Sequence, residues 1–167
     1  MFKTGDTVLY GMDGVCRIED ITTIDVPGID NNRLYYVISM KNNKGTSYVP
    51  VDSGKSKMRK LITLEEAMEV VGRIAEIEPL QPRDRKRPEP EYKQALRTYD
   101  CINLIRLIKC IYFRITQRVN EGKKATAVDE KYMDLAENVL YQELGIVLGI
   151  PREQVLDFII KKCDKRL

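Results

Sequence analysis

The residues of this chain best suited to chemistry with a partner are cations gathered in one stretch. Segment 81–124 holds twelve Lys and Arg against five Asp and Glu, whereas residues 1–58 hold seven of each. Dense ammonium and guanidinium groups release counterions when they meet phosphates, which gives affinity without base preference. The segment therefore predicts phosphate binding to nucleic acid, and a solvated linker is the alternative. The candidates are Arg83, Arg85, Lys86, Arg87, Lys93 and Arg97, then Arg106 and Lys109 at i,i+3 on one helix face.

Catalytic and metal chemistry finds little support, because the chain has no histidine and only four scattered cysteines. Without histidine there is no usual proton shuttle and no Ser-His or Cys-His pair. No CxxC is present, so we expect no zinc site. Cys101 and Cys110 stand nine positions apart on one predicted helix, on opposite faces and roughly 13 Å apart, so they cannot bridge each other. We expect reduced, mostly buried thiols, no enzymatic activity, no cofactor and no small-molecule substrate.

The texture of the sequence changes near Lys57, which predicts an α+β protein in two parts. Before Lys57, turns recur often and β-branched and tyrosine residues dominate; after it, apolar residues recur every three or four positions. We expect a small SH3/Tudor-like antiparallel β-barrel over 1–58 and an all-α bundle of about five helices over 59–167. The expected strands are 7–10, 15–18, 34–40 and 46–52, and the expected helices are 63–78, 90–99, 101–120, 126–144 and 152–162.

Local signals set several of these helix bounds. Thr63 followed by Glu66 is a capping-box signature, and the segment from Thr126 to Asp129 resembles a second cap. Gly145 and Gly149-Ile150-Pro151 are expected to break the chain after the helix that begins near Thr126. The apolar run 104–115, which includes Tyr112 and Phe113, covers more than half of a helix circumference. This breadth is typical of the central helix of a bundle, so we expect the run to be core.

No run of eighteen apolar residues is present, and the first residues lead directly into a strand pattern. We therefore expect a soluble, cytoplasmic protein with no membrane partner.

The first 62 residues resemble the RNA-polymerase-interacting module of the bacterial CarD/CdnL transcription factors. The family pattern is a start of the form FKxGDxVVY, a turn ending in HGV, then IxxI, a YYV strand, a VPVDN-like strand and an (L/I)R.LI segment. The matching residues here are Phe2–Tyr10, Gly14-Val15, Ile18–Ile21, Tyr35–Val37, Val49–Asp52 and Met58–Ile62. An unrelated SH3-like or Tudor-like barrel is the alternative, because that fold serves many functions.

The resemblance implies two partners, the RNA polymerase β subunit for the barrel and promoter DNA for the helical part. It implies polymerase contacts at Ile24, Tyr48, Val49 and Pro50, through an edge strand added to the polymerase sheet. Relatives often carry arginines where Ile24 and Tyr48 stand, so an apolar contact would replace a charged one. The alternative for Val49 and Pro50 is a core residue beside a proline that blocks aggregation.

The resemblance also implies DNA-backbone contacts at Lys93 and Lys131. The family wedges an exposed tryptophan into the minor groove at the edge of the melted region, and this chain has no tryptophan. Pro88 matches the position, with Tyr92 one helical turn further on, and proline can act as such a wedge. We therefore expect weaker stabilisation of the fork than in relatives that carry tryptophan.

Together these features predict a transcription regulator that bridges RNA polymerase and promoter DNA at the upstream edge of the bubble, largely without sequence specificity, and that modulates open-complex stability. Such a protein would be associated with the nucleoid through the polymerase. The alternative is a protein-only adaptor, in which the helical part binds a second protein instead of DNA.

Overall fold

The computed structural model describes residues 1–40, 45–52 and 57–164. The fold is α+β, as predicted: an antiparallel sheet is followed by five helices. Contacts divide the chain into two compact units, Met1–Leu61 (the sheet unit) and Ile62–Leu167 (the helical unit).

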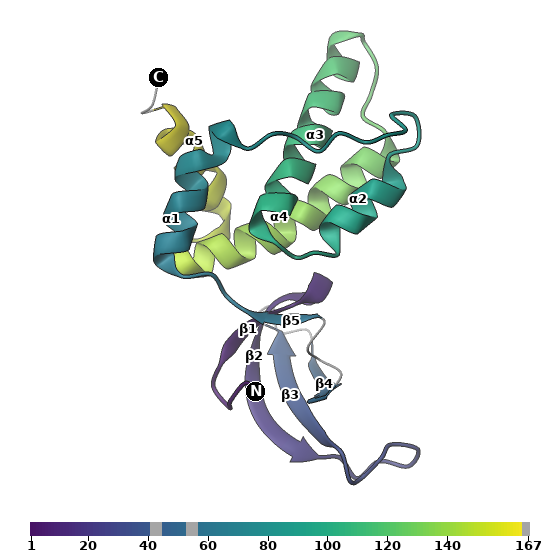
Figure 1. Cartoon of the computed structure of the whole chain (residues 1–167), viewed down its shortest axis with the longest axis vertical. Coiled ribbons are helices and arrows are strands. Elements are labelled where there is room, and N and C mark those ends of the chain that lie inside the picture. The colour runs from purple at the N-terminus through teal and green to yellow at the C-terminus, as the bar shows by residue number, and fades with distance from the viewer. Residues whose placement is uncertain (41–44, 53–56, 165–167) are drawn as a thin grey trace. The chain divides into compact units, whose positions relative to one another are not determined.

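The sheet unit contains five antiparallel strands in the order β4-β3-β2-β1-β5 (Figure 1). Within the described residues no pairing joins β4 to β5, so the sheet is open and a closed barrel stays a prediction. The 3-10 turn η1 (Gly11–Asp13) links the first two strands, and Gly14 after it has a φ of 77°, which favours glycine. The strands are β1 (Thr7–Tyr10), β2 (Gly14–Thr23), β3 (Leu34–Met40), β4 (Thr46–Pro50) and β5 (Met58–Lys60).

Strand β2 is longer than predicted, because a β-bulge at two charged residues allows the strand to continue beyond them. The register against β3 shifts between Ile18 and Asp20, and this leaves Glu19 and Asp20 exposed while the pairing continues to Thr23. The short strand β5 was missed, and it pairs with β1. The core beneath the sheet consists of Val8, Cys16, Ile18, Tyr36, Ile38, Val49 and Met58.

The helical unit has the five predicted helices, although some bounds differ. The predicted span 101–120 is confirmed, whereas the first helix is shorter and ends in a 3-10 turn. The elements are α1 (Leu64–Arg73), η3 (Ile74–Glu76), α2 (Glu89–Leu96), α3 (Cys101–Asn120), α4 (Ala127–Leu148), η4 (Arg152–Gln154) and α5 (Val155–Asp164).

Both predicted caps are confirmed. The Thr63 hydroxyl accepts a hydrogen bond from the Glu66 N–H at 3.1 Å, and the Glu66 carboxylate accepts one from the Thr63 N–H at 2.7 Å. At the start of α4, the Thr126 hydroxyl accepts from the Asp129 N–H at 3.1 Å. The caps satisfy N–H groups that lack partners within the helix and so fix where α1 and α4 begin.

The prediction that Gly145 ends a helix was wrong, since α4 continues to Leu148. A Cβ at Gly145 would lie 3.0 Å from the Ile150 carbonyl oxygen, so the glycine permits a close approach by the chain that follows. The helix ends instead at Gly149, which has a left-handed φ of 69°.

Helices α3 and α4 pack against each other, α2 packs against both, and α1 packs against α4 and α5 (Figure 1). The segment between α1 and α2 crosses α3 (Figure 1), and the Leu80 N–H donates to the Arg106 carbonyl there at 3.0 Å. This crossing brings the basic residues that follow Leu80 to the side of α3.

Candidate nucleic-acid interface

A carboxylate-anchored turn holds the densest group of cations. The Asp84 carboxylate accepts hydrogen bonds from the backbone N–H groups of Lys86 and Arg87, at 2.8 and 3.2 Å. The Glu91 carboxylate accepts from the backbone N–H of Arg83 at 2.8 Å. Both acids therefore bind main-chain groups, and their hydrogen bonds shape the turn. We call residues 83–87 the basic turn.

The cationic side chains of the basic turn are exposed to solvent. Across the described parts of the chain, none of the four has an ion-pair partner within 4.0 Å. Their charges stay available to an anionic partner. These residues are Arg83, Arg85, Lys86 and Arg87.

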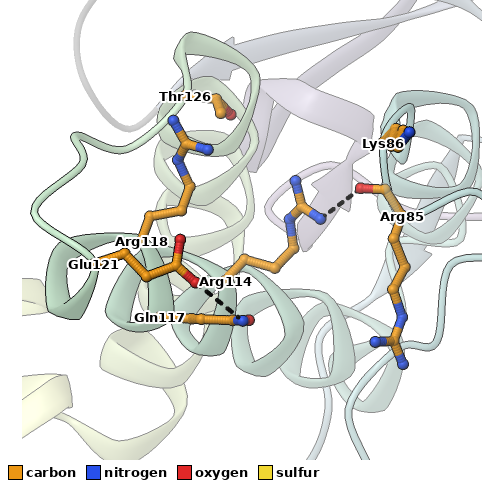
Figure 2. Close-up of a pocket in the computed structure, with 7 residues that line it drawn as sticks. All are labelled: Arg85, Lys86, Arg114, Gln117, Arg118, Glu121 and Thr126. Atoms are coloured by element: carbon orange, nitrogen blue, oxygen red, sulfur yellow. Dashed lines mark hydrogen bonds between the residues drawn. The ribbon is translucent and has the colours of Figure 1, made fainter.

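Beside the basic turn lies an open pocket of about 390 Å³, which sequence reasoning did not find. It is lined by Arg85 and Lys86 from the turn and by Arg114 and Arg118 from α3, with one carboxylate, Glu121, on its wall (Figure 2). Arg114 reaches toward the Arg85 carbonyl, to which its Nη1 donates at 2.8 Å (Figure 2). The missed signal is the i,i+4 spacing of Arg114 and Arg118, which places both on one side of α3.

Arg114 is held by a buried acid. The Asp129 side chain is fully buried, and its Oδ1 accepts from the Arg114 Nε at 3.2 Å and from the Tyr92 hydroxyl at 3.0 Å. Burial raises the pKa of Tyr92, and the nearby Cys110 and Asp129 raise it further, so this hydroxyl stays a donor. The pKa of Arg114 is also raised: burial opposes the charge, but the hydrogen bond to Asp129 and the electrostatic interactions with Tyr92, Asp129 and Cys110 together outweigh that cost. The guanidinium is thus charged and fixed in orientation.

The other predicted phosphate contacts divide into two groups. Lys93 and Arg97, on and just after α2, are exposed. Lys109 makes hydrogen bonds inside the helical unit, because its ammonium donates to the carbonyls of Ile74 at 2.5 Å and Ile77 at 2.7 Å.

Lys131 and Arg106 also have acidic neighbours. The Lys131 ammonium lies 3.8 Å from a Glu89 oxygen and 5.2 Å from the centre of the Tyr132 ring. Arg106 is half-buried and lines a separate pocket with several carboxylates, among them Glu69 and Glu78. Both cations are less available to phosphate than those of the basic turn.

Two residues proposed for the wedge are not at the surface. Tyr92 has no exposed area, because its ring packs against Tyr132 and its hydroxyl is bound to Asp129. Pro88 is also buried, at the N-cap of α2. The prediction that these two side chains face DNA is therefore corrected: they hold α2 in place beneath the basic turn.

The long helix α3 also departs from the expected pattern. Leu104, Leu107 and Ile111 are fully buried, as expected. Tyr112 and Phe113 are not core, since 60% and 58% of their surfaces are exposed.

In the sheet unit, the residues implied to contact polymerase lie in or near one edge strand. Strand β4 forms an edge of the sheet, and Tyr48 on it is 55% exposed. Val49 next to it is buried in the core, and Pro50 is half-buried. Ile24 is only 8% exposed, so its prediction as a direct contact is corrected to a core role, as expected for an apolar side chain at a strand end.

Within the described ranges, no group of three or more His, Cys, Asp or Glu side chains could hold a metal ion. Among the helices described there, none has the length and apolar character to cross a membrane.

The comparison with curated proteins gave no match. A family model described as the CarD-like/TRCF RID domain matches residues 2–62, which cover the whole described sheet. Domains of this family are non-catalytic modules that interact with RNA polymerase. Residues 2–62, which include the strands of the sheet unit, are therefore similar to the CarD-like family of RNA-polymerase-interacting domains.

Proposed function

We propose that this protein is a transcription regulator that binds the β subunit of RNA polymerase through its sheet unit and promoter DNA through its helical unit. In this proposal the helical unit meets DNA at the upstream edge of the bubble and modulates the stability of the open complex. The protein acts in the bacterial cytoplasm, on the nucleoid, and residues 1–58 and 59–167 serve as its two functional domains.

The observation that carries the DNA half is the basic turn with its neighbouring pocket. Four exposed cations, for which the described residues supply no ion-pair partner, lie beside two arginines of α3, and the turn's own acid is bound to the backbone. Such density favours phosphate through counterion release. The proposed contacts are to phosphates, which carry little sequence preference.

The polymerase half is supported by the family of the sheet unit and by strand β4 at its edge. An edge strand offers backbone groups to a further strand, and the exposed Tyr48 adds an apolar contact. Closure of the sheet into a Tudor-like barrel is part of the same proposal.

Tethering explains how weak phosphate contacts become effective. Once the sheet unit binds polymerase, the helical unit is confined near the promoter, and its effective concentration there rises to the millimolar range. Contacts that hold free DNA only weakly then favour the DNA conformation that they fit best.

The decisive experiment is the salt dependence of binding between the full chain and a fork-junction DNA. For each phosphate neutralised, log K falls by roughly 0.7 to 0.9 per decade of salt. The double variant Arg85→Gln/Lys86→Gln is therefore expected to lower the slope by about 1.5. The matched control is Arg152→Gln/Lys161→Gln, which removes one exposed Arg and one exposed Lys from η4 and α5 and should leave the slope unchanged.

The protein-only adaptor is the second candidate. It is favoured by Leu156 and Ile160 on α5, which are both about half exposed at an i,i+4 spacing. An adaptor would bind the fork DNA barely at all, with no salt slope to lose, whereas the DNA-binding regulator requires steep weakening with salt.

A further inference from the structure

Two neighbouring aromatic rings of α3 stand in solvent, and one of them, Phe113, lies beside Arg85 of the basic turn. Tyr112 and Phe113 are more than half exposed, and their ring centres lie 6.2 Å apart with the planes at 66°. Aromatic rings are costly to leave in water, because burial of apolar surface is favourable. A pair of them on a helix with a well-filled inner face indicates a binding surface.

The surroundings of Phe113 combine apolar residues, among them Pro79 and Leu80, with two arginines. The ring lines a groove of about 200 Å³ together with Pro82, Arg85, Arg114 and Gln117. Arg85, Arg114 and Gln117 also line the larger pocket beside the basic turn. The Phe113 ring and the cationic pocket are thus neighbours, because they share these three residues.

This combination has a specific chemistry. Proteins that bind single-stranded nucleic acid stack bases on exposed aromatic rings while cations track the backbone phosphates. A lipid or an apolar protein surface would match the rings but would leave the guanidinium groups without anions. Arg114 is already fixed by Asp129 and by the Arg85 carbonyl, so little ordering is needed when a ligand binds.

We infer that Phe113, supported by Tyr112, is a stacking site for an unpaired nucleobase whose phosphates are held by Arg85, Lys86 and Arg118. The inference rests on the proposed function and deepens it, because it makes single-stranded DNA the preferred ligand of the helical unit. In a duplex the bases are stacked on one another, so the rings of α3 add nothing to duplex binding.

The first test measures the affinity of the full chain for a labelled oligothymidine of about ten nucleotides and for a duplex of equal length, by fluorescence anisotropy. Phe113→Ala is expected to weaken single-strand binding about tenfold and to change duplex binding less than about twofold. The matched control is Leu156→Ala on α5, which removes another exposed apolar side chain from the same unit and should change neither affinity.

A second variant tests contact directly. Because the chain has no tryptophan, Phe113→Trp introduces a single fluorophore at the site. Oligothymidine should quench its emission with the same dissociation constant as the anisotropy reports, and Leu156→Trp should not be quenched.

The outcomes separate this inference from the proposal beneath it. If the unsubstituted protein binds neither single strand nor duplex, the DNA-binding function itself fails. If it binds both and Phe113→Ala weakens them equally or not at all, only the stacking site is overturned. Loss of polymerase binding with intact single-strand affinity in Phe113→Ala would also overturn it, because the rings would then be a protein contact.

Discussion

The arginines of the sheet unit and the cations of the basic turn differ in their partners. In the sheet unit, Arg17 and Arg33 pair with carboxylates, and the Arg33–Asp52 pair is short, with Nη2 and Oδ2 2.6 Å apart. In the helical unit, the acids nearest to the basic turn bind backbone N–H groups. The cations of the basic turn therefore face solvent without ion-pair partners among the described residues. The sheet unit thus has paired arginines and an edge strand, β4, whereas the basic turn presents positive charge.

The cores of the two units differ in the polar groups that they bury. The buried cluster of the sheet unit is apolar, apart from the Cys16 thiol and the Tyr36 hydroxyl. The helical unit buries two carboxylates, Asp129 and Glu143, and each holds groups from elsewhere in that unit. Glu143 accepts from the Ile62 N–H at 3.0 Å and from the Cys101 thiol at 3.3 Å. The comparison teaches that the helical unit uses internal acids to fix its polar groups, whereas the sheet unit depends on strand pairing and apolar packing.

The largest expected effect comes from breaking the Arg114–Asp129 pair. Arg114→Leu leaves a buried carboxylate without its charge partner, which should destabilise the helical unit by about 3 kcal/mol. Hydrogen exchange followed by mass spectrometry reports each unit separately, and protection of the sheet unit should stay unchanged. Arg118→Leu is the control, and its expected cost is below about 1 kcal/mol. Equal loss of protection in both units would contradict the division drawn above.

Replacement of one exposed tyrosine in each unit by alanine tests which unit binds the polymerase β subunit. Tyr48→Ala should weaken binding of the full chain to the isolated polymerase β subunit about tenfold, because it removes the exposed apolar contact of β4. Tyr112→Ala removes an equally exposed tyrosine from the helical unit and should change this affinity less than about twofold. Surface plasmon resonance measures both. A larger loss for Tyr112→Ala would mean that the helical unit also meets the β subunit.

The helix caps give a smaller and purely local effect. Thr63→Ala removes the capping-box hydroxyl of α1 and should lower the free energy of unfolding of the helical unit by about 1 kcal/mol. Thr23→Ala, which changes an exposed threonine of β2, should cost the sheet unit less than about 0.5 kcal/mol. Urea unfolding monitored by circular dichroism measures both; similar costs for the two variants would show that the hydroxyl does not cap α1.

The smallest effect is a pH dependence confined to the sheet unit. Burial raises the pKa of the Cys16 thiol from 9.0 to about 11, and Asp13 adds to the shift. The unfolded chain therefore loses this proton first as pH rises, and stability should fall between pH 9 and 11. At pH 9.5 the loss should stay below about 1 kcal/mol. Cys16→Val should remove this loss of stability, which is measured as hydrogen-exchange protection of the sheet unit. If the loss persists in the variant, another group causes it.

The sequence by itself determined the features that depend on neighbouring residues. Caps and periodicity defined α3 and placed the starts of α1 and α4, because a cap is a contact over three residues. The motif from Phe2 to Ile62 identified the family of the sheet unit, and the local count of Lys and Arg identified the basic turn. The bulge in β2 was missed because two consecutive charges look like a strand end.

Only the tertiary structure decided which surface each side chain occupies. Periodicity predicted that α3 is apolar over more than half of its circumference. The packing of α2 and α4 determines which side of α3 is buried, and Tyr112 and Phe113 lie outside the buried side. Tyr92 was expected at the surface and is buried, because Asp129, distant in sequence, gives its hydroxyl a partner. The pocket joins Arg85, Arg114 and Thr126, which come together only when the segment after α1 crosses α3. Contacts between distant segments depend on how elements pack, and no local pattern in a single sequence encodes that packing.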